Sequence, residues 1–325
     1  MGAGGRAGAG PTGAPWVEAN GWAIRLIDSQ SPGKPVWVAS TPPRGSRMAA
    51  YQLAVADAAA YGARWVATFD EQLRDGLAAG KAEARESWAG ICRAVSFFEE
   101  HKEWRTLVPA AVMGVMSTFA GPNTFLGGEL LNLLARRQVA YRVLDPAAAD
   151  FSGLHALVYV DADPPRGAAA ERLLAFARDG GLLLTPPGFS VEGTPAEEHL
   201  SFDVKTVGKG RVGVARRRWS DPYRVAMDAH LLMSRRHDVL RLWNPGSILA
   251  HCTQSASGDR AVVHLINYST REASHEVTLG LTKKYRMARM ITFEKTTAIE
   301  PGAAAHGIEL RLPPVPVYAA IELSS

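Results

Sequence analysis

The apolar run VPAAVMGVM (108–116), the polar turn STFAGPN (117–123) and the amphipathic segment FLGGELLNLLARRQ (125–138) contain the pattern that decides the fold. An apolar strand ends at a turn with Gly and Pro, and that turn leads into a helix. The same alternation continues in AYRVL (140–144), HALVYV (155–160), RGAAAERLLAFARDG (166–180) and GLLLT (181–185). Continuous apolar strands that alternate with amphipathic helices predict a parallel sheet covered on both faces.

The segment before residue 107 is expected to add two short strands and three helices. The strands are KPVWVAS (34–40) and RWVATFD (64–70), and the helices are 16–30, 48–62 with Gly62 as its cap, and 84–104. Two interpretations compete. The strands either join the central sheet in one doubly wound domain, or they form the last two units of a (β/α) barrel. Two strands cannot close a barrel, so the second interpretation requires another segment, another chain or a partner to cover their edge.

The pattern of apolar and polar residues changes after residue 185. A Pro- and Gly-rich stretch (186–198) is interpreted as a linker. Short alternating runs follow, from FDVKTV (202–207) and RVGVA (211–215) to VYAAIEL (317–323), and they predict an antiparallel β-sandwich. One helix over 221–236 interrupts them, with Asp221 as its N-cap and Pro222 at its first position.

The sequence therefore predicts an α/β plus all-β protein in successive parts. The parts are a flexible tail (1–15), barrel-like βα units (16–106), a flavodoxin-like α/β domain (107–190) and a β-sandwich (191–325).

Composition excludes several classes of function. The chain has 325 residues, 47% of them hydrophobic and 21% charged, with a formal net charge of +4, as in ordinary globular proteins. The basic clusters at 216–218 and 235–236 are local, so nucleic acid is not an expected partner. No run of about 18 apolar residues predicts a membrane span, and no apolar leader predicts export. Cys92 and Cys252 form no CxxC pair, and together with the missing leader they indicate a reducing, cytoplasmic location.

Two motif types give negative results. GKGRVG (208–213) satisfies GxGxxG through its glycines, but strand-like residues lie on both sides and no helix begins after it. It is therefore interpreted as a β-hairpin turn and not as a dinucleotide site. The nine histidines contain no HxxxH or HExxH pair, so neither a metal site nor a cofactor is expected.

Asp70 and Glu71 are the candidate catalytic residues, because they close an apolar strand and barrels keep catalytic groups at such ends. The alternative is a helix N-cap or a solvated loop. Asp161 ends the strand HALVYV without a GxSxG or cysteine elbow, and Asn123 lies in a turn at a helix start. Both are candidate substrate-binding residues, with a loop or N-cap role as the alternative.

Trp37 and Trp65 lie on the two short strands of the barrel-like segment. They are candidate substrate-binding residues as well, because two indole rings could form a platform on which a sugar stacks. Core packing is the alternative for each ring, since large aromatic side chains dominate cores.

The order of the parts resembles the C-terminal half of multidomain glycoside hydrolases of the barrel superfamily, and bacterial β-galactosidases in particular. The resemblance is carried by WVATFD (65–70), by VMGVM (112–116) with ELLNLLARR (129–137), by DGGLLL (179–184) and by VVHLINYS (262–269). It implies a barrel end, a glutamine-amidotransferase-like domain used for oligomerisation, and a β-sandwich. Carbohydrate and a second copy of the chain are the implied partners.

The chain departs from that family at the catalytic positions. The family uses two glutamates, whereas the end of 34–40 carries Ala39, Ser40 and Thr41, and the only nearby carboxylates are Asp70 and Glu18. Two hypotheses follow: a glycoside hydrolase-like protein that hydrolyses or binds polysaccharide or oligosaccharide, or a non-catalytic module for oligomerisation and glycan binding. A third, a single doubly wound domain with a small-molecule pocket at the strand ends, is also retained.

Overall fold

The structure, a computed structural model, describes residues 19–39 and 42–325. It has a mixed α/β architecture with parallel and antiparallel sheets, and it divides into two compact units. Unit 1 comprises the described residues up to Pro109 together with Leu240–Ser325, and unit 2 comprises Ala110–Val239. The expected tail (1–15), Glu18, Ser40 and Thr41 lie outside the described residues.

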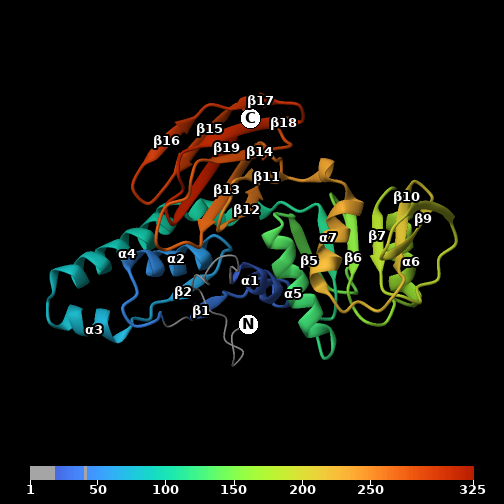
Figure 1. The fold of residues 1–325 in the computed structure, drawn as a ribbon, viewed down its shortest axis with the longest axis horizontal. Helices are drawn as coiled ribbons and strands as arrows, with labels where there is room; N and C mark the ends of the chain where they lie inside the picture. The colour runs from blue at the N-terminus through green and yellow to red at the C-terminus, as the bar shows by residue number, and fades with distance from the viewer. Residues whose placement is uncertain (1–18, 40–41) are drawn as a thin grey trace. The chain divides into compact units, whose positions relative to one another are not determined.

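Unit 2 is built on one seven-stranded sheet with the order β5-β4-β6-β7-β10-β9-β8. Its strands are β4 (Met113–Met116), β5 (Tyr141–Leu144), β6 (Ala156–Tyr159), β7 (Leu182–Thr185), β8 (Thr194–Glu198), β9 (Phe202–Val207) and β10 (Gly210–Ala215). β5, β4, β6, β7 and β10 run parallel, and β9 and β8 are antiparallel additions at one edge. The helices are α5 (Asn123–Arg136), α6 (Gly167–Arg178) and α7 (Pro222–Met233), which Figure 1 shows beside these strands.

The parallel sheet predicted from the alternating pattern is present. Every residue of β4, β6 and β7 is buried, as expected for strands that are covered on both faces. Asp221 caps α7 as predicted, because its carboxylate accepts from the backbone N–H groups of Tyr223 and Arg224.

The strands at the carboxyl-terminal end of unit 2 differ from what the sequence predicts. Residues 202–215 were expected to begin the β-sandwich, but β10 pairs with β7 in parallel and carries β9 with it. The expected linker also contains the edge strand β8. The hairpin predicted at 208–213 is confirmed, because β9 and β10 join through Gly208, whose φ is +61°.

Within residues 19–39 and 42–109, unit 1 contains two short parallel strands and four α-helices. β1 (Trp37–Ala39) pairs only with β2 (Arg64–Val66), so the alternative in which these strands join the central sheet is wrong for the described residues. The helices are α1 (Gly21–Gln30), α2 (Met48–Ala59), α3 (Glu71–Ala78) and α4 (Ala82–Glu100), followed by the 3₁₀ helix η1 (Lys102–Thr106). Helix α3 lies between the strand and the helix expected at 64–70 and 84–104, where the sequence analysis placed no element.

The second part of unit 1 consists of two antiparallel sheets. One has four strands in the order β11-β14-β18-β17, and the other has six in the order β16-β15-β19-β13-β12-β3. The bounds are β3 (Val108–Pro109), β11 (Leu240–Trp243), β12 (Ile248–Gln254), β13 (Arg260–Asn267), β14 (Val277–Leu281), β15 (Met287–Ile291), β16 (Thr296–Ile299), β17 (Gly302–Ala304), β18 (Gly307–Leu312) and β19 (Tyr318–Ser324). β3 pairs with β12, so the apolar run 108–116 supplies two strands, one to each unit.

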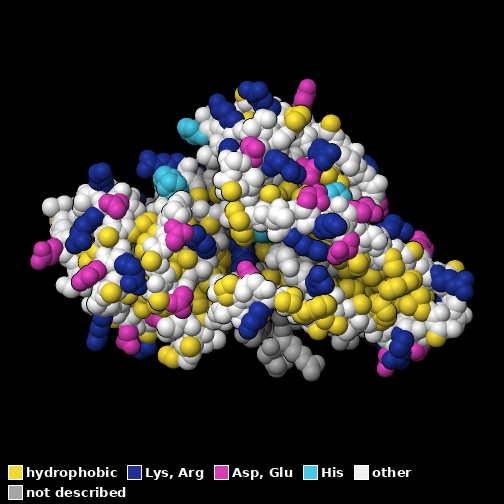
Figure 2. Space-filling model, turned by 180° about the vertical axis from the view of Figure 1, so that it is seen from behind, with side chains coloured by type: hydrophobic (Ala, Val, Ile, Leu, Met, Phe, Trp, Pro, Cys, Tyr) yellow, Lys and Arg dark blue, Asp and Glu magenta, His cyan; other side chains and the backbone are white. Residues whose placement is uncertain are grey.

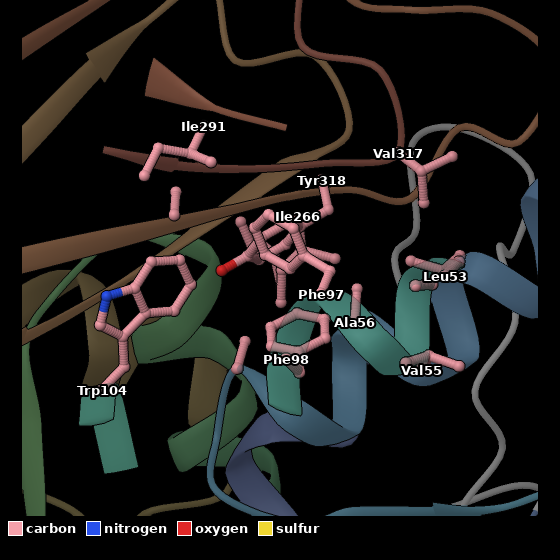
Figure 3. Close-up of a cluster of buried hydrophobic side chains, with 14 of the residues drawn as sticks. Leu53, Val55, Ala56, Phe97, Phe98, Trp104, Ile266, Ile291, Val317 and Tyr318 are labelled. Carbon is pink, nitrogen blue, oxygen red and sulfur yellow. The ribbon is translucent and has the colours of Figure 1, made fainter. Parts of the chain in front are cut away.

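The helices α2 and α4 pack against the six-stranded sheet through one apolar cluster, and Figure 3 shows side chains from both sides of this interface. Phe97 and Phe98 of α4 contact the ring of Tyr318 on β19, with centroid distances of 5.8 and 4.9 Å. Ile266 of β13 and Leu53 of α2 are fully buried in the same cluster. Segments that were expected to be separate domains therefore share one core.

A buried polar network crosses the same interface. Asp57 of α2 accepts a hydrogen bond from the side-chain nitrogen of Asn20 at 2.6 Å, and it accepts another from the hydroxyl of Tyr268, just after β13. Burial raises the pKa of Asp57 to about 6, although the hydrogen bonds from Tyr268 and Asn20 act in the opposite direction. This network ties the helical part of unit 1 to its antiparallel sheet at one specific position.

Candidate functional site

Asp70 follows β2 and serves as the N-cap of α3. Its Oδ1 accepts hydrogen bonds from the backbone N–H groups of Gln72 and Leu73 at 2.7 and 3.1 Å. Its Oδ2 accepts from the hydroxyl of Tyr51 at 2.6 Å. The residue is only 5% exposed. One oxygen of its carboxylate caps the start of a helix, and the other accepts a hydrogen bond from a buried phenol.

The electrostatic environment of Asp70 favours its ionised form. Burial raises the pKa of the carboxyl group, but the hydrogen bonds from Tyr51, Leu73 and Gln72 together outweigh burial, and the pKa is lowered. A general acid in a glycosidase needs the opposite shift. Glu71, the neighbouring candidate, is exposed in the first turn of α3. The catalytic role of both residues stays a prediction, while the geometry gives Asp70 a structural role.

We expect Asp70→Ala to lower the free energy of unfolding by about 2 kcal/mol, because it removes an N-cap and leaves the buried hydroxyl of Tyr51 without its acceptor. Asp70→Asn should lower the free energy of unfolding much less, since asparagine also caps helices and its side-chain oxygen still accepts a hydrogen bond. Urea denaturation of both variants checks this. Equal stability of Asp70→Ala and the unsubstituted protein would contradict the structural role.

The structure does not bring Trp37 and Trp65 onto one face. In the β1–β2 pair Trp37 lies opposite Arg64, and Val38 lies opposite Trp65, so the two indoles project to opposite sides of the pair. Trp37 is 58% exposed, and the guanidinium of Arg64 lies 5.6 Å from its ring centroid. Trp65 is partly buried against Tyr51, with its ring centroid 6.4 Å away. Only Trp37 presents an open ring to solvent.

Asn123 and Asp161, by contrast, lie close together at the carboxyl ends of the parallel strands of unit 2. Asp161 follows β6 and accepts hydrogen bonds from the hydroxyl of Ser117 and the backbone N–H of Thr118, at 2.5 and 3.1 Å. Asn123 begins α5; it accepts from the backbone N–H of Ala162 at 3.1 Å. These bonds connect the turn after β4 to the end of β6, which is the edge where parallel sheets bind ligands.

Asn123 and Asp161 line a cavity of about 60 Å³ together with two residues that the sequence analysis did not select, Arg218 and Trp219. Such a volume holds a few waters or one small polar group. Arg218 and Trp219 follow β10, and they reach this edge because β10 runs parallel to β7. The sequence signal was RRRW (216–219) directly after a strand, but it points to this site only once that strand is assigned to the parallel sheet.

A separate row of contacting aromatic and histidine rings, here called the ladder, lies within unit 1. Tyr61 stacks on His251 with a centroid distance of 4.6 Å, His251 stacks on His264 at 5.8 Å, and Trp104 meets the edge of His264 at 5.7 Å. A cavity of about 260 Å³ lies along this ladder. The guanidinium of Arg25 donates to Nδ1 of His251, so this imidazole is neutral with its proton on Nε2.

The two buried histidines are held in their neutral forms. Burial lowers the pKa of His264 to about 3, and burial, Arg25 and His264 lower the pKa of His251 well below its ordinary value. The hydroxyl of Tyr318 lies 2.7 Å from Nδ1 of His264. Tyr61 and His264 both stack on His251, and the guanidinium of Arg25 lies 5.2 Å from the ring centroid of Tyr61, so we interpret the ladder as packing rather than as a surface for ligand stacking.

We expect His264 to make unit 1 less stable in acid. Its folded-state pKa lies below 6.5, so the unfolded chain binds the proton more tightly, and stability falls as the pH decreases from about 6.5 toward about 3. Relative to His264→Gln, the unsubstituted protein should lose about 2 kcal/mol between pH 6.5 and pH 5. Urea denaturation at both pH values measures this difference, and His306→Gln, at an exposed position, is the matched control. If the free energy of unfolding changed by the same amount between the two pH values in all three proteins, the prediction would be contradicted.

The described residues show neither a metal cluster nor a membrane helix. Among residues 19–39 and 42–325, no group of three His, Cys, Asp or Glu side chains is placed to hold a metal ion. Within the same ranges, no helix combines the length and apolarity that a membrane crossing requires.

Comparison with known proteins gives likeness at the level of the fold. No family model matches the sequence, and no curated protein matches it. Among solved structures, α-L-fucosidase isoenzyme 2 from Paenibacillus thiaminolyticus is 13% identical, with a TM-score of 0.61 over 93% of this chain and 62% of the fucosidase. The β-galactosidase from Bacillus circulans sp. alkalophilus is 12% identical, with a TM-score of 0.62 over 94% of this chain and 58% of that enzyme.

A third similar structure is a catalytic mutant of Gan42B, a GH42 β-galactosidase from G. stearothermophilus. It is 12% identical, with a TM-score of 0.61 over 98% of this chain and 59% of the enzyme. The chain thus spans about three fifths of the length of these structures. Its fold is that of glycoside hydrolases of this type and is consistent with their C-terminal portion, which confirms the resemblance found in the sequence.

Proposed function

We propose that this chain is a glycan-binding protein with a glycoside hydrolase-like fold, and that Asp70 and Glu71 do not form a two-carboxylate hydrolytic site. The observation that carries the proposal is the likeness of more than nine tenths of the chain to a fucosidase and to β-galactosidases. Carbohydrate is the ligand class that those enzymes have in common.

The proposal assigns a role to each part of the fold. β1 and β2 with α1–α4 are the last units of a (β/α) barrel, and the parallel sheet of unit 2 is an amidotransferase-like domain. The two antiparallel sheets of unit 1 are the two layers of a β-sandwich. In support, β1 and β2 are parallel and each is followed by a helix, as in barrel units.

Binding is favoured over hydrolysis by the state of the carboxylates. A glycosidase needs two carboxyl groups about 5–5.5 Å apart for retention, or about 6.5–9.5 Å apart for inversion, and one of them must hold its proton at neutral pH. Both oxygens of Asp70 accept hydrogen bonds, and the pKa of this carboxyl is lowered. Asp161 is likewise engaged by Ser117 and Thr118.

The carboxyl edge of the parallel sheet is the surface that we assign to the glycan. Trp219 is partly buried there, and its indole can offer an apolar face to a sugar ring while polar groups of Asn123 and Arg218 lie in the adjoining cavity. An apolar platform beside a few fixed polar groups is the usual composition of a small-ligand site.

Calorimetric titration with a panel of oligosaccharides tests the proposal. We expect at least one oligosaccharide to bind, and Trp219→Ala to weaken that binding about tenfold through loss of the apolar platform. Trp37→Ala, the matched control, removes an exposed indole from unit 1 and should leave binding unchanged.

Hydrolysis of the same panel is measured in parallel with Asp70→Asn/Glu71→Gln. The proposal predicts no difference in product release between this variant and the unsubstituted protein. If no oligosaccharide in the panel bound, glycan binding would be wrong. If the double variant stayed folded and lost a measurable hydrolysis, Asp70 and Glu71 would be catalytic after all.

A further inference from the structure

A pocket rich in arginine lies beside the small cavity in unit 2. It has a volume of about 560 Å³, which falls within the range of small-ligand sites. The segment between β10 and α7 and the first turns of α7 supply most of its wall. Its lining includes Arg216, Arg217, Arg218, Trp219, Arg224 and Asp228. Arg218 and Trp219 also line the cavity with Asn123 and Asp161, so the two spaces share a wall.

Three of the four arginines that line this pocket have no side-chain partner among the described residues. Arg216 forms an ion pair with Asp203 at 2.9 Å. No side-chain hydrogen bond or ion pair joins Arg217, Arg218 or Arg224 to another residue in the ranges that the structure describes. Guanidinium groups bind carboxylates and sulfates through two parallel hydrogen bonds, so three such groups around one pocket favour an anionic ligand.

Asp228 gives the pocket a second and different preference. It belongs to α7, lines the pocket and is only 4% exposed. Its Oδ1 lies 3.8 Å from Nε2 of His199, and its Oδ2 has no hydrogen-bond partner among the described residues. A buried carboxylate oxygen without a donor is unfavourable, and a ligand hydroxyl would satisfy it. The pocket therefore favours a ligand that carries donors as well as a negative charge.

Aromatic side chains complete the wall. Trp219 and Phe202 line the pocket, and their rings meet edge to face with a centroid distance of 6.3 Å. The indole is thus held in place by its neighbour, as a stacking platform requires. A simple inorganic anion would use the guanidinium groups but neither the indole nor Asp228.

We propose that this pocket binds an acidic oligosaccharide, with a carboxylate or sulfate on Arg217, Arg218 and Arg224, a sugar hydroxyl on Asp228, and a pyranose ring against Trp219. This inference rests on the proposed function and specifies its ligand class.

A long polyanion such as nucleic acid is a poorer match to the same surface. Asp221 and Asp228 line the pocket together with the arginines, so a long continuous row of phosphates would meet these carboxylates as well as the guanidinium groups. On the face that Figure 2 presents, Lys and Arg side chains are interspersed with Asp and Glu.

The test compares trigalacturonate with galactotriose of the same linkage, which differ only in their carboxylates, by calorimetric titration of the full chain. We expect trigalacturonate to bind at least tenfold more tightly. Arg217→Ala/Arg224→Ala should weaken its binding about a hundredfold, roughly tenfold for each charge-assisted contact, and should leave galactotriose binding unchanged. Arg85→Ala/Arg271→Ala removes the same charge from exposed positions in unit 1 and should have no effect.

Further arms separate the sources of binding. Asp228→Asn should weaken both trisaccharides by a similar factor, and a sulfated galactotriose should bind as trigalacturonate does. Equal binding of trigalacturonate and galactotriose would overturn the inference while leaving glycan binding intact, and binding of neither would overturn both. If inorganic sulfate bound as tightly as trigalacturonate, the pocket would be a non-specific anion site and the inference would be overturned. The inference would also be overturned if Arg85→Ala/Arg271→Ala weakened trigalacturonate binding as much as Arg217→Ala/Arg224→Ala does.

Discussion

The helices α2 and α4 and the six-stranded antiparallel sheet are far apart in the sequence, yet each needs the other to bury its apolar surface. Residues 51–58 of α2 are buried on every side, and α4 contributes Phe97 and Phe98 to the same cluster. The two-stranded sheet of β1 and β2 is too small to cover such helices. Burial against Tyr318 and its neighbours supplies what is missing, and each fully buried aromatic ring contributes about 2–3 kcal/mol.

This interface constrains the chemistry of the segment that contains β1, β2 and α1–α4. Because α2 is fixed in the core, Tyr51 is held where its hydroxyl donates to Asp70, and Asp70 in turn begins α3. A carboxylate in that position stabilises the fold in its ionised form, and it is poorly suited to proton donation. Among the described residues, the buried Oδ2 of Asp228 has no hydrogen-bond partner, and the side chains of Arg217, Arg218 and Arg224 in the neighbouring pocket form no ion pair. We therefore place ligand binding at the carboxyl edge of the parallel sheet.

Local signals in the sequence predicted several elements correctly. The pairing of strands that are distant in the sequence could not be predicted from such signals. Asp221 and Pro222 predicted the start of α7, and Gly208 predicted a hairpin, because caps and turns depend on adjacent residues. The runs 202–207 and 211–215 were identified as strands, but alternation does not specify a partner, so their place beside β7 was missed. Arg218 and Trp219 were missed for the same reason. Asn123 and Asp161 were selected from the sequence, and the structure brings them to one edge because strand ends in parallel sheets converge there; their role in ligand binding stays a prediction.

Hydrogen exchange followed by mass spectrometry tests most directly whether the two parts of unit 1 depend on one shared core. The account predicts that the slowest amides of α4 and of β13 open with the same free energy, and that Phe97→Ala lowers both by the same amount, about 3–5 kcal/mol. If the amides of α4 opened several kcal/mol more easily than those of β13, and Phe97→Ala changed only α4, the helices and the sheet would be independent and the account would be contradicted.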